Sequence, residues 1–311
     1  MFCRSLFSAL VNKYPPPTII KLNDKSTAEE SELNKITGFS SIADSLKADD
    51  LVIYVAHDVW FQLPPEVVQL RFESMKKKKN VVWAADKECW PNHWSSKACN
   101  WIPDSTLPTD IYGNKTDVDK LCYRPRWLNS GAVLGRGDRM KKMFKYATTK
   151  LSRTTPPPTT TQGILAEVFQ ERYKQEKYVL DYESEFIQTM TKSVQDVMWS
   201  NDLHEGTLSS SPLSTRQYPK KIDLRGLLDE TNSPWRGRNL AWNRITNSVP
   251  AAIHLNGWDG EKIVEPSWTK MWWFDELLEI TEKMMKDEKA GAWVGETWKS
   301  WNDLCGEISL F

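Results

Sequence analysis

A carboxylate and an imidazole stand at the ends of two predicted strands, and together these groups can bind a divalent cation. Asp58 follows the β-rich run 51–55, and His254 ends the predicted strand 251–254. In α/β sheets, ligands bind at the carboxyl ends of parallel strands, so polar residues there are candidates for chemistry. Carboxylate oxygens and imidazole nitrogens both coordinate metals. Plainer interpretations remain open, with Asp58 as a turn or helix-cap residue and His254 as a structural histidine.

A second acidic residue is missing beside Asp58. A reaction that expels a diphosphate needs a cation to offset the developing charge, and its usual signature is two acidic residues a few positions apart at a strand end. Val55 and Ala56 stand just before this turn instead. The sequence therefore offers one carboxylate where two are expected.

Small polar residues form two further motifs. Asn129, Ser130 and Gly131 precede a predicted strand, and Asn256 and Gly257 follow the histidine. Exposed backbone amides and small polar side chains of this kind can receive a ligand hydroxyl or phosphate, although a plain turn explains them equally well. The sequence has no GxSxG elbow, no GxxxxGK[ST] loop and no HExxH helix, which argues against the enzyme classes that use them.

Short apolar runs alternate with segments of helical period, which predicts an α/β fold with helices on the faces of a sheet. We predict strands at 18–22, 51–55, 81–85, 132–134 and 251–254. We predict helices at 1–12, 42–48, 64–76, 138–151, 163–174 and 268–285. A loop of about forty residues, 86–127, suggests a functional segment, because structureless loops of that length are uncommon. The tract 154–161 is rich in Thr and Pro, and the polar region 200–238 is not assigned.

The composition excludes several functional classes. The 311 residues contain 41 Lys plus Arg and 41 Asp plus Glu, so no net charge favours nucleic acid as a partner. No apolar run is long enough for a membrane span, and we expect none. Among 16 tryptophans we expect most in the core and a minority at a ligand site. Cys89 and Cys99 flank a short loop, where they either form a disulfide or remain free buried thiols.

Five blocks, taken in order, resemble the glycosyltransferase domain of procollagen lysyl hydroxylases and a related group of uncharacterised fungal proteins. The blocks span roughly residues 5 to 275. They are Asp58-Val59-Trp60-Phe61, Cys89-Trp90-Pro91, Leu128-Asn129-Ser130-Gly131, Leu180-Asp181 to Gln188, and His254-Leu255-Asn256-Gly257.

This resemblance implies a GT-A fold, a Rossmann-like mixed sheet flanked by helices, as a single domain over 1–285 with a C-terminal tail at 286–311. It implies transfer of a hexose from a UDP-sugar to a hydroxyl on a protein or glycan acceptor, with Mn²⁺ or Mg²⁺ as cofactor. The secretory pathway or Golgi would be the location. The implied metal ligands are Asp58 and His254. The implied donor-binding residues are Trp90, Asn129, Ser130, Gly131, Asn256 and Gly257.

Three departures from the family pattern point to an alternative function. The family's leading metal acid falls at Val55 or Ala56, and Thr160-Thr161 replace acidic residues just before Gln162. The family's first, nucleotide-binding strand is also absent, which we interpret as a truncated gene model or as degeneration. The alternative is therefore a catalytically degenerate relative that binds a glycan or a sugar nucleotide, and we expect any metal to bind weakly. No catalytic residue is assigned.

Overall fold

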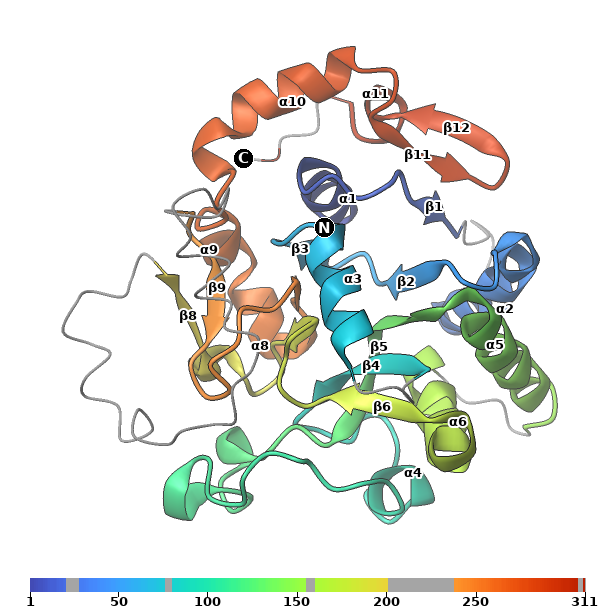
Figure 1. The fold of residues 1–311 in the computed structure, drawn as a ribbon, viewed down its shortest axis with the longest axis vertical. Coiled ribbons are helices and arrows are strands. Elements are labelled where there is room, and N and C mark those ends of the chain that lie inside the picture. Colours follow the sequence, from blue (N-terminus) through green and yellow to red (C-terminus); the bar gives the residue numbers. More distant parts are fainter. Residues whose placement is uncertain (21–27, 76–79, 155–159, 201–237, 307–309, 311) are drawn as a thin grey trace.

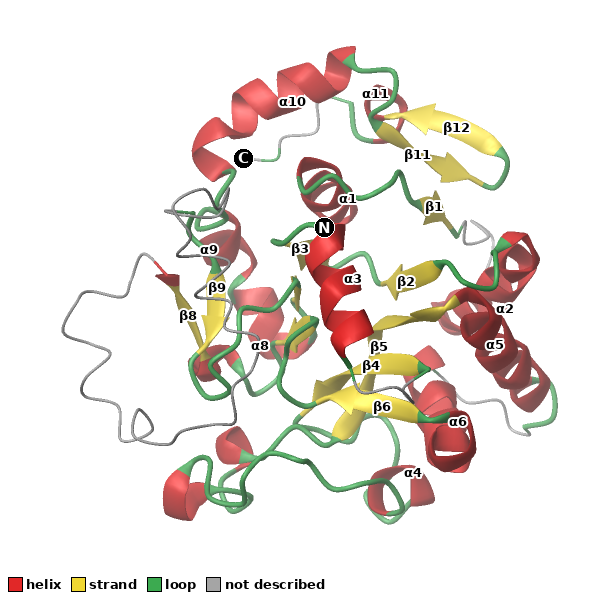
Figure 2. Ribbon diagram, viewed as in Figure 1, coloured by secondary structure: helices red, strands yellow, loops and turns green. Residues whose placement is uncertain are grey.

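The computed structural model describes residues 1–20, 28–75, 80–154, 160–200, 238–306 and 310 (Figure 1). Helices and strands alternate through these segments, and mixed sheets are flanked by helices, which confirms the predicted α/β class (Figure 2). Most of the unassigned region 200–238 and part of the tract 154–161 lie outside the described residues. Among the described residues, no helix is long and apolar enough to cross a bilayer.

The central sheet has the strand order β2-β5-β4-β6. Its strands are β2 (Leu51–Val55), β5 (Trp127–Arg136), β4 (Val81–Asp86) and β6 (Tyr178–Asp181). Strand β5 is antiparallel to both β2 and β4, and β4 is parallel to β6. The carboxyl ends of β2, β4 and β6 therefore meet the start of β5 at one edge of the sheet. Strand β5 is much longer than the predicted 132–134.

Both faces of this sheet are covered, as the continuous apolar run of β4 requires. Val81 and Trp83 share one core cluster with residues of α2 (Ala28–Ile42), α5 (Gly137–Leu151) and α6 (Thr161–Glu176). On the opposite face, Val82 and Ala84 cluster with Val68 and Phe72 of α3 (Pro65–Ser74). Figure 1 shows α2, α5 and α6 grouped at one side of the sheet.

A second sheet, β3-β10-β7, brings together segments that are distant in the sequence. Strand β10 (Ala252–His254) pairs antiparallel with β3 (Val59–Phe61) and parallel with β7 (Ile187–Thr189). The Thr189 hydroxyl donates to the Ala85 carbonyl at 2.7 Å, which joins this sheet to the end of β4. Two smaller sheets contain β8 (Val197–Trp199) with β9 (Ala241–Asn243), and β1 (Thr18–Ile19) with β11 (Gly291–Val294) and β12 (Thr297–Ser300).

The two ends of the chain pack together. Helix α1 (Phe2–Val11) lies against β3, and Cys3 forms a disulfide with Cys305, just after α11 (Trp301–Leu304). Strand β11, which lies beyond residue 285, pairs with β1. Both ends contribute to one hydrophobic cluster, in which four tryptophans are fully buried: Trp60, Trp268, Trp273 and Trp301. The division into a domain at 1–285 and a tail stays a prediction, but within the described residues the tail segment packs on the N-terminal helix.

Two predicted helices are wrong. The segment 268–285 is not one helix but contains the end of α9 (Val264–Trp268), a 3₁₀ turn (Phe274–Glu276) and α10 (Leu277–Lys286). Trp268 and Trp273 are both fully buried in the same cluster. Residues five apart on a continuous helix lie about 140° apart, so one helix would direct these two indoles to different faces. The break resolves that conflict.

The predicted short helix 42–48 is also displaced. Residue 42 ends the longer α2, and only the 3₁₀ turn Ala43–Ser45 follows. The long loop 86–127 is mostly irregular, as predicted. It contains α4 (Lys97–Asn100) and the 3₁₀ turns Gly113–Lys115 and Lys120–Cys122. The remaining short elements are the 3₁₀ turn Val194–Asp196 and α8 (Gly257–Lys262).

Candidate functional site

Asp58 and His254 meet at the edge of the second sheet. Asp58 occupies the turn that joins β2 to β3, and the antiparallel pairing of β3 with β10 places Val59 opposite His254. The Leu255 amide donates to the Asp58 carbonyl at 3.0 Å. As a result, Nε2 of His254 lies 3.2 Å from Oδ1 of Asp58. The predicted convergence of these two residues is confirmed.

The histidine keeps one ring nitrogen without a partner. Oδ1 of Asp58 is buried and faces Nε2 of His254, whereas Nδ1 of His254 is buried and has no hydrogen-bond partner among the described residues. Burial by itself raises the pKa of Asp58, but the hydrogen bond and charge of His254 outweigh it and lower that pKa to about 2. Buried polar atoms are normally satisfied, so each exception calls for an explanation. The 3.2 Å between Oδ1 of Asp58 and Nε2 of His254 is also short enough for one cation to bind both atoms.

Gly131 makes room for the histidine ring. A methyl group at position 131 would lie 1.9 Å from Cε1 of His254 and 2.4 Å from Nδ1, which no structure tolerates. The register between β4 and β5 shifts at this point, since Trp83 pairs with Val133 but Ala84 pairs with Asn129. Such a bulge re-aims the strand beside a site. The predicted motif at 129–131 is therefore part of the same arrangement as Asp58 and His254.

Asp86 is the central carboxylate that the sequence analysis passed over. It is the last residue of β4 and is almost fully buried. Its Oδ2 accepts hydrogen bonds from Nδ2 of Asn129 and Nδ2 of Asn256, both at 2.9 Å, and its Oδ1 accepts from the Lys87 amide at 2.7 Å. Burial raises the pKa of Asp86, and these hydrogen bonds partly counteract it.

The two asparagines predicted to contact the donor bind the protein itself. Oδ1 of Asn129 accepts from the Gly131 amide at 2.8 Å, and Oδ1 of Asn256 accepts from the Met190 amide at 2.8 Å. With their amide groups directed at Asp86, both side chains hold that carboxylate in position. Contact with a donor stays a prediction for both.

The other predicted donor residues surround this network. The Ser130 amide donates to Oε1 of Gln162 at 2.6 Å, so the first turn of α6 is attached to the 129–131 motif. Gly257 has a φ of +68°, which favours glycine, and a methyl group there would lie 2.7 Å from Oγ1 of Thr191. Trp90 is 59% exposed, on the loop that follows Asp86.

The protein offers two ligands to a cation at this edge. Among the described residues, no group of three or more His, Cys, Asp or Glu side chains is arranged to hold a metal ion. A divalent cation would fit between Oδ1 of Asp58 and Nε2 of His254, and its other oxygen ligands would come from water or from a bound anion.

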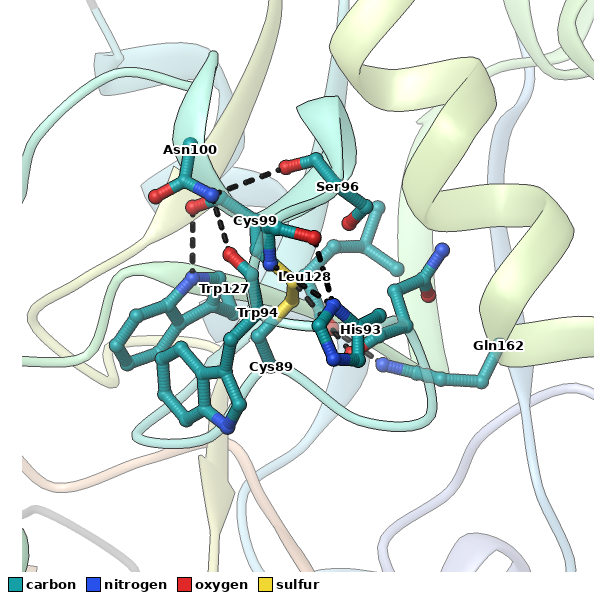
Figure 3. Close-up of a disulfide and its surroundings, with 11 residues drawn as sticks. Cys89, His93, Trp94, Ser96, Cys99, Asn100, Trp127, Leu128 and Gln162 are labelled. Atoms are coloured by element: carbon teal, nitrogen blue, oxygen red, sulfur yellow. Dashed lines mark hydrogen bonds between the residues drawn. A yellow bond between two sulfur atoms is a disulfide. The ribbon is translucent and has the colours of Figure 1, made fainter.

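The loop that carries Trp90 is closed by a disulfide, one of the two alternatives that the sequence left open. Cys89 and Cys99 are bonded, with their Cα atoms 5.7 Å apart, and the alternative of free thiols is excluded. The Trp127 indole donates to the Cys99 carbonyl at 3.1 Å (Figure 3). Gln162 also donates to the Leu128 carbonyl, next to Trp127. The loop is thus fixed to the start of β5.

Comparisons with known proteins give only remote similarity. No protein-family model and no curated protein matches the chain. An active-site mutant of LgtC has a TM-score of 0.33 at 11% identity, over 73% of this chain and 64% of its own. The apo form of the bifunctional glycosyltransferase WbbM has a TM-score of 0.35 at 13% identity, over 84% of this chain and 36% of its own. Apo mouse xyloside xylosyltransferase 1 has a TM-score of 0.30 at 8% identity, over 61% of this chain and 62% of its own. The chain spans less than two thirds of each of these proteins, and similarity at this level assigns no activity to it.

Proposed function

We propose that this chain is a glycosyltransferase-like protein that binds a UDP-sugar at the edge formed by β2, β4 and β5, with Mn²⁺ or Mg²⁺ at Asp58 and His254. The observation that supports it is the approach of Nε2 of His254 to Oδ1 of Asp58 at 3.2 Å, which is close enough for one cation to bind both atoms. The order of the sequence blocks that resemble a glycosyltransferase domain supports the same function.

In the transfer itself, the bond between the hexose C1 and the diphosphate oxygen breaks, and the acceptor hydroxyl oxygen bonds to C1. The hydroxyl proton is released with the UDP. When bound, the cation offsets the negative charge that develops on the leaving diphosphate. Asp58 and His254 hold that position, while Asn129 and Asn256 keep Asp86 fixed beside it.

A catalytically degenerate relative that only binds a glycan or a sugar nucleotide is the second candidate, and two observations favour it. Among the described residues, no third His, Cys, Asp or Glu joins Asp58 and His254 in a group that could hold a metal ion. Thr160 and Thr161 stand where the resembling family has acidic residues. Thr160 caps α6 by accepting from the Gly163 amide, and Thr161 is buried. Neither hydroxyl replaces a carboxylate.

Calorimetry with UDP and Mn²⁺ tests the metal role. We expect Mn²⁺ alone to bind on the order of millimolar, because low ligand charge lowers affinity. The diphosphate of UDP should complete the coordination shell of Mn²⁺, so UDP should bind more tightly when Mn²⁺ is present. Asp58→Asn should remove this gain, whereas the control Asp44→Asn, an exposed Asp in the 3₁₀ turn after α2, should not. Equal affinities for wild type and Asp58→Asn would sink the metal role.

Restoring the missing acid separates the two candidate functions. Ala56 donates its amide to the Gly131 carbonyl at 2.7 Å, so a side chain at 56 starts beside the site. Ala56→Asp and Val55→Asp are made separately and assayed for Mn²⁺-dependent hydrolysis of a panel of UDP-hexoses. Activity in wild type establishes a transferase, and activity gained in a variant marks a decayed one. No hydrolysis in any of the three proteins favours the binding function.

A further inference from the structure

Two exposed tryptophans stand together on the loop after β4. Trp94 is 50% exposed and Trp101 is 63% exposed, and they lie at either side of the single turn of α4 (Lys97–Asn100). Large apolar side chains that are exposed in one segment indicate a binding surface, because their hydration is unfavourable. Of the residues that separate them, Ser95, Lys97 and Asn100 are exposed, whereas Ala98 and Cys99 are buried.

This part of the loop is held rigidly. The Trp94 ring packs edge-on against the buried Trp127, with centroids 5.1 Å apart and an interplanar angle of 88°. The disulfide between Cys89 and Cys99 closes the same loop, as Figure 3 shows. Asn100 donates to the Trp94 carbonyl and to the Ser96 carbonyl, which ties the two ends of the turn together. A ligand that binds here loses little affinity to ordering of the protein.

The groups around the indoles favour a saccharide over a protein partner. His93, Ser95 and Asn100 are exposed beside the two rings. The only charged side chain in this stretch, Lys97, places Nζ 4.8 Å from the centroid of the Trp101 ring. Protein interfaces have a contiguous apolar core. Separated indole faces with hydroxyl, imidazole and amide groups between them match the C–H faces and hydroxyl rims of a neutral sugar chain.

The surface is also continuous with the candidate site. Trp127, which supports Trp94, begins the strand β5 that carries Asn129 to Gly131. On the other side of the loop, atoms of Pro91 and Asn92 lie within 3.7 Å of the position of a methyl group on Gly163, in the first turn of α6. A glycan bound at Trp94 and Trp101 would therefore contact a surface that is attached to β5, the strand at which a sugar donor would bind.

We infer that Trp94 and Trp101 bind the sugar rings of a neutral glycan, which is the acceptor class of this protein. The acceptor role rests on the proposed function, whereas glycan binding does not. The two indoles stack on separate rings, and their polar neighbours receive the hydroxyl groups.

Calorimetric titration of the full chain with cellohexaose, mannohexaose and a galactohexaose tests this inference, with an unglycosylated serine-rich peptide as the protein-type probe. At least one hexaose should bind. Trp94→Ala and Trp101→Ala should each weaken binding by about three- to tenfold, the factor that one aromatic stacking contact contributes. Trp293→Ala is the matched control. Trp293 is 43% exposed and packs edge-on against Trp298, and both lie in the sheet β1-β11-β12 rather than on this loop. It should leave binding unchanged, and thermal unfolding should confirm that all variants fold.

Parallel titrations with UDP and Mn²⁺ keep the two proposals distinguishable. UDP affinity should be the same in all three tryptophan variants. Glycan binding that depends on Trp94 and Trp101 supports the surface even if UDP does not bind, an outcome that counts only against the proposed function. Binding of no hexaose, binding that neither substitution weakens, or binding of the peptide instead overturns the inference, whatever the UDP result.

Discussion

Gly131→Ala should disrupt the candidate site through a single added methyl group. That methyl would lie 1.9 Å from Cε1 of His254, about half of an ordinary carbon contact, so the ring must move by roughly 1.5 Å or more. His254 is buried, and overpacking of this kind costs about 1–3 kcal/mol. For a chain of this size the midpoint of thermal unfolding should fall by about 2–10 °C.

A double-mutant cycle isolates the cause. Once His254→Ala has removed the ring, Gly131→Ala should cost almost nothing, so the coupling free energy should equal most of the single-mutant penalty, about 1–3 kcal/mol. Urea unfolding of the four proteins at neutral pH gives these values. Gly163→Ala is the control, since a methyl there meets its nearest atoms at 3.4 Å or more and a helical alanine is favourable.

Binding provides a second readout of the same perturbation. Displacing the ring separates His254 from Asp58, so the Mn²⁺-dependent part of UDP affinity should be lost in Gly131→Ala, although neither ligand has been replaced. The reasoning is refuted if Gly131→Ala unfolds within about 0.5 kcal/mol of wild type and shows no coupling to His254→Ala, which is the additivity expected of independent sites.

Three further predictions concern stability. Cys3→Ser should destabilise the protein by about 5 kcal/mol and Cys89→Ser by about 3 kcal/mol, because the first disulfide closes a loop of sequence separation 302 and the second a loop of separation 10. Guanidinium unfolding that reverses this order would contradict the entropic argument. Burial raises the pKa of Asp181 to about 6, above its unfolded value of 3.8, so the penalty for its charge appears as pH rises from about 4 to 6. Urea unfolding at pH 4 to 7 should therefore show wild type losing stability relative to Asp181→Asn across that window, and a gain would be the wrong sign. Lys87→Met should cost about 3–5 kcal/mol, because Nζ of Lys87 lies 2.5 Å from the buried Asp196 carboxylate, and adding Asp196→Asn should recover part of this loss; no recovery would mean that the cost is one of packing.

Local patterns were sufficient for the elements that begin the site. The β-rich runs 51–55 and 81–85 are strands, and the polar residues at the ends of two strands, Asp58 and His254, converge as expected. The strand predictions succeed because strand propensity is local, whereas Asp58 and His254 converge because β10 pairs antiparallel with β3, which follows Asp58 directly. The pairing of Cys89 with Cys99 follows in the same way, since ten residues of loop keep two cysteines close.

Long-range pairing decided what the sequence analysis missed. Asp86 was interpreted as the start of a loop, although it ends a strand just as clearly as the residues that were selected. Its hydrogen-bond partners lie 43 and 170 residues away, and only the sheet order brings Asn129 and Asn256 to it. The bulge opposite Ala84 is equally invisible, because no local signal shows that β5 skips from residue 133 to 129 in its pairing with β4.

The strand-end carboxylates of Asp58, Asp86 and Asp181 differ in the groups that their oxygens already bind. This difference indicates which of them could also bind a ligand. Both oxygens of Asp181 accept backbone amides, from Glu185, Phe186 and Ile187, so its binding capacity is used within its own turn. Asp86 accepts from two side-chain amides and one backbone amide, which fix it but come from residues beside the candidate site. The buried Oδ1 of Asp58 faces Nε2 of His254 at 3.2 Å and makes no other hydrogen bond among the described residues. The position after a strand thus selects three candidates, and the proposed cation belongs at Asp58, because its carboxylate faces an imidazole that can share the ion, whereas backbone and side-chain amides already fill the other two.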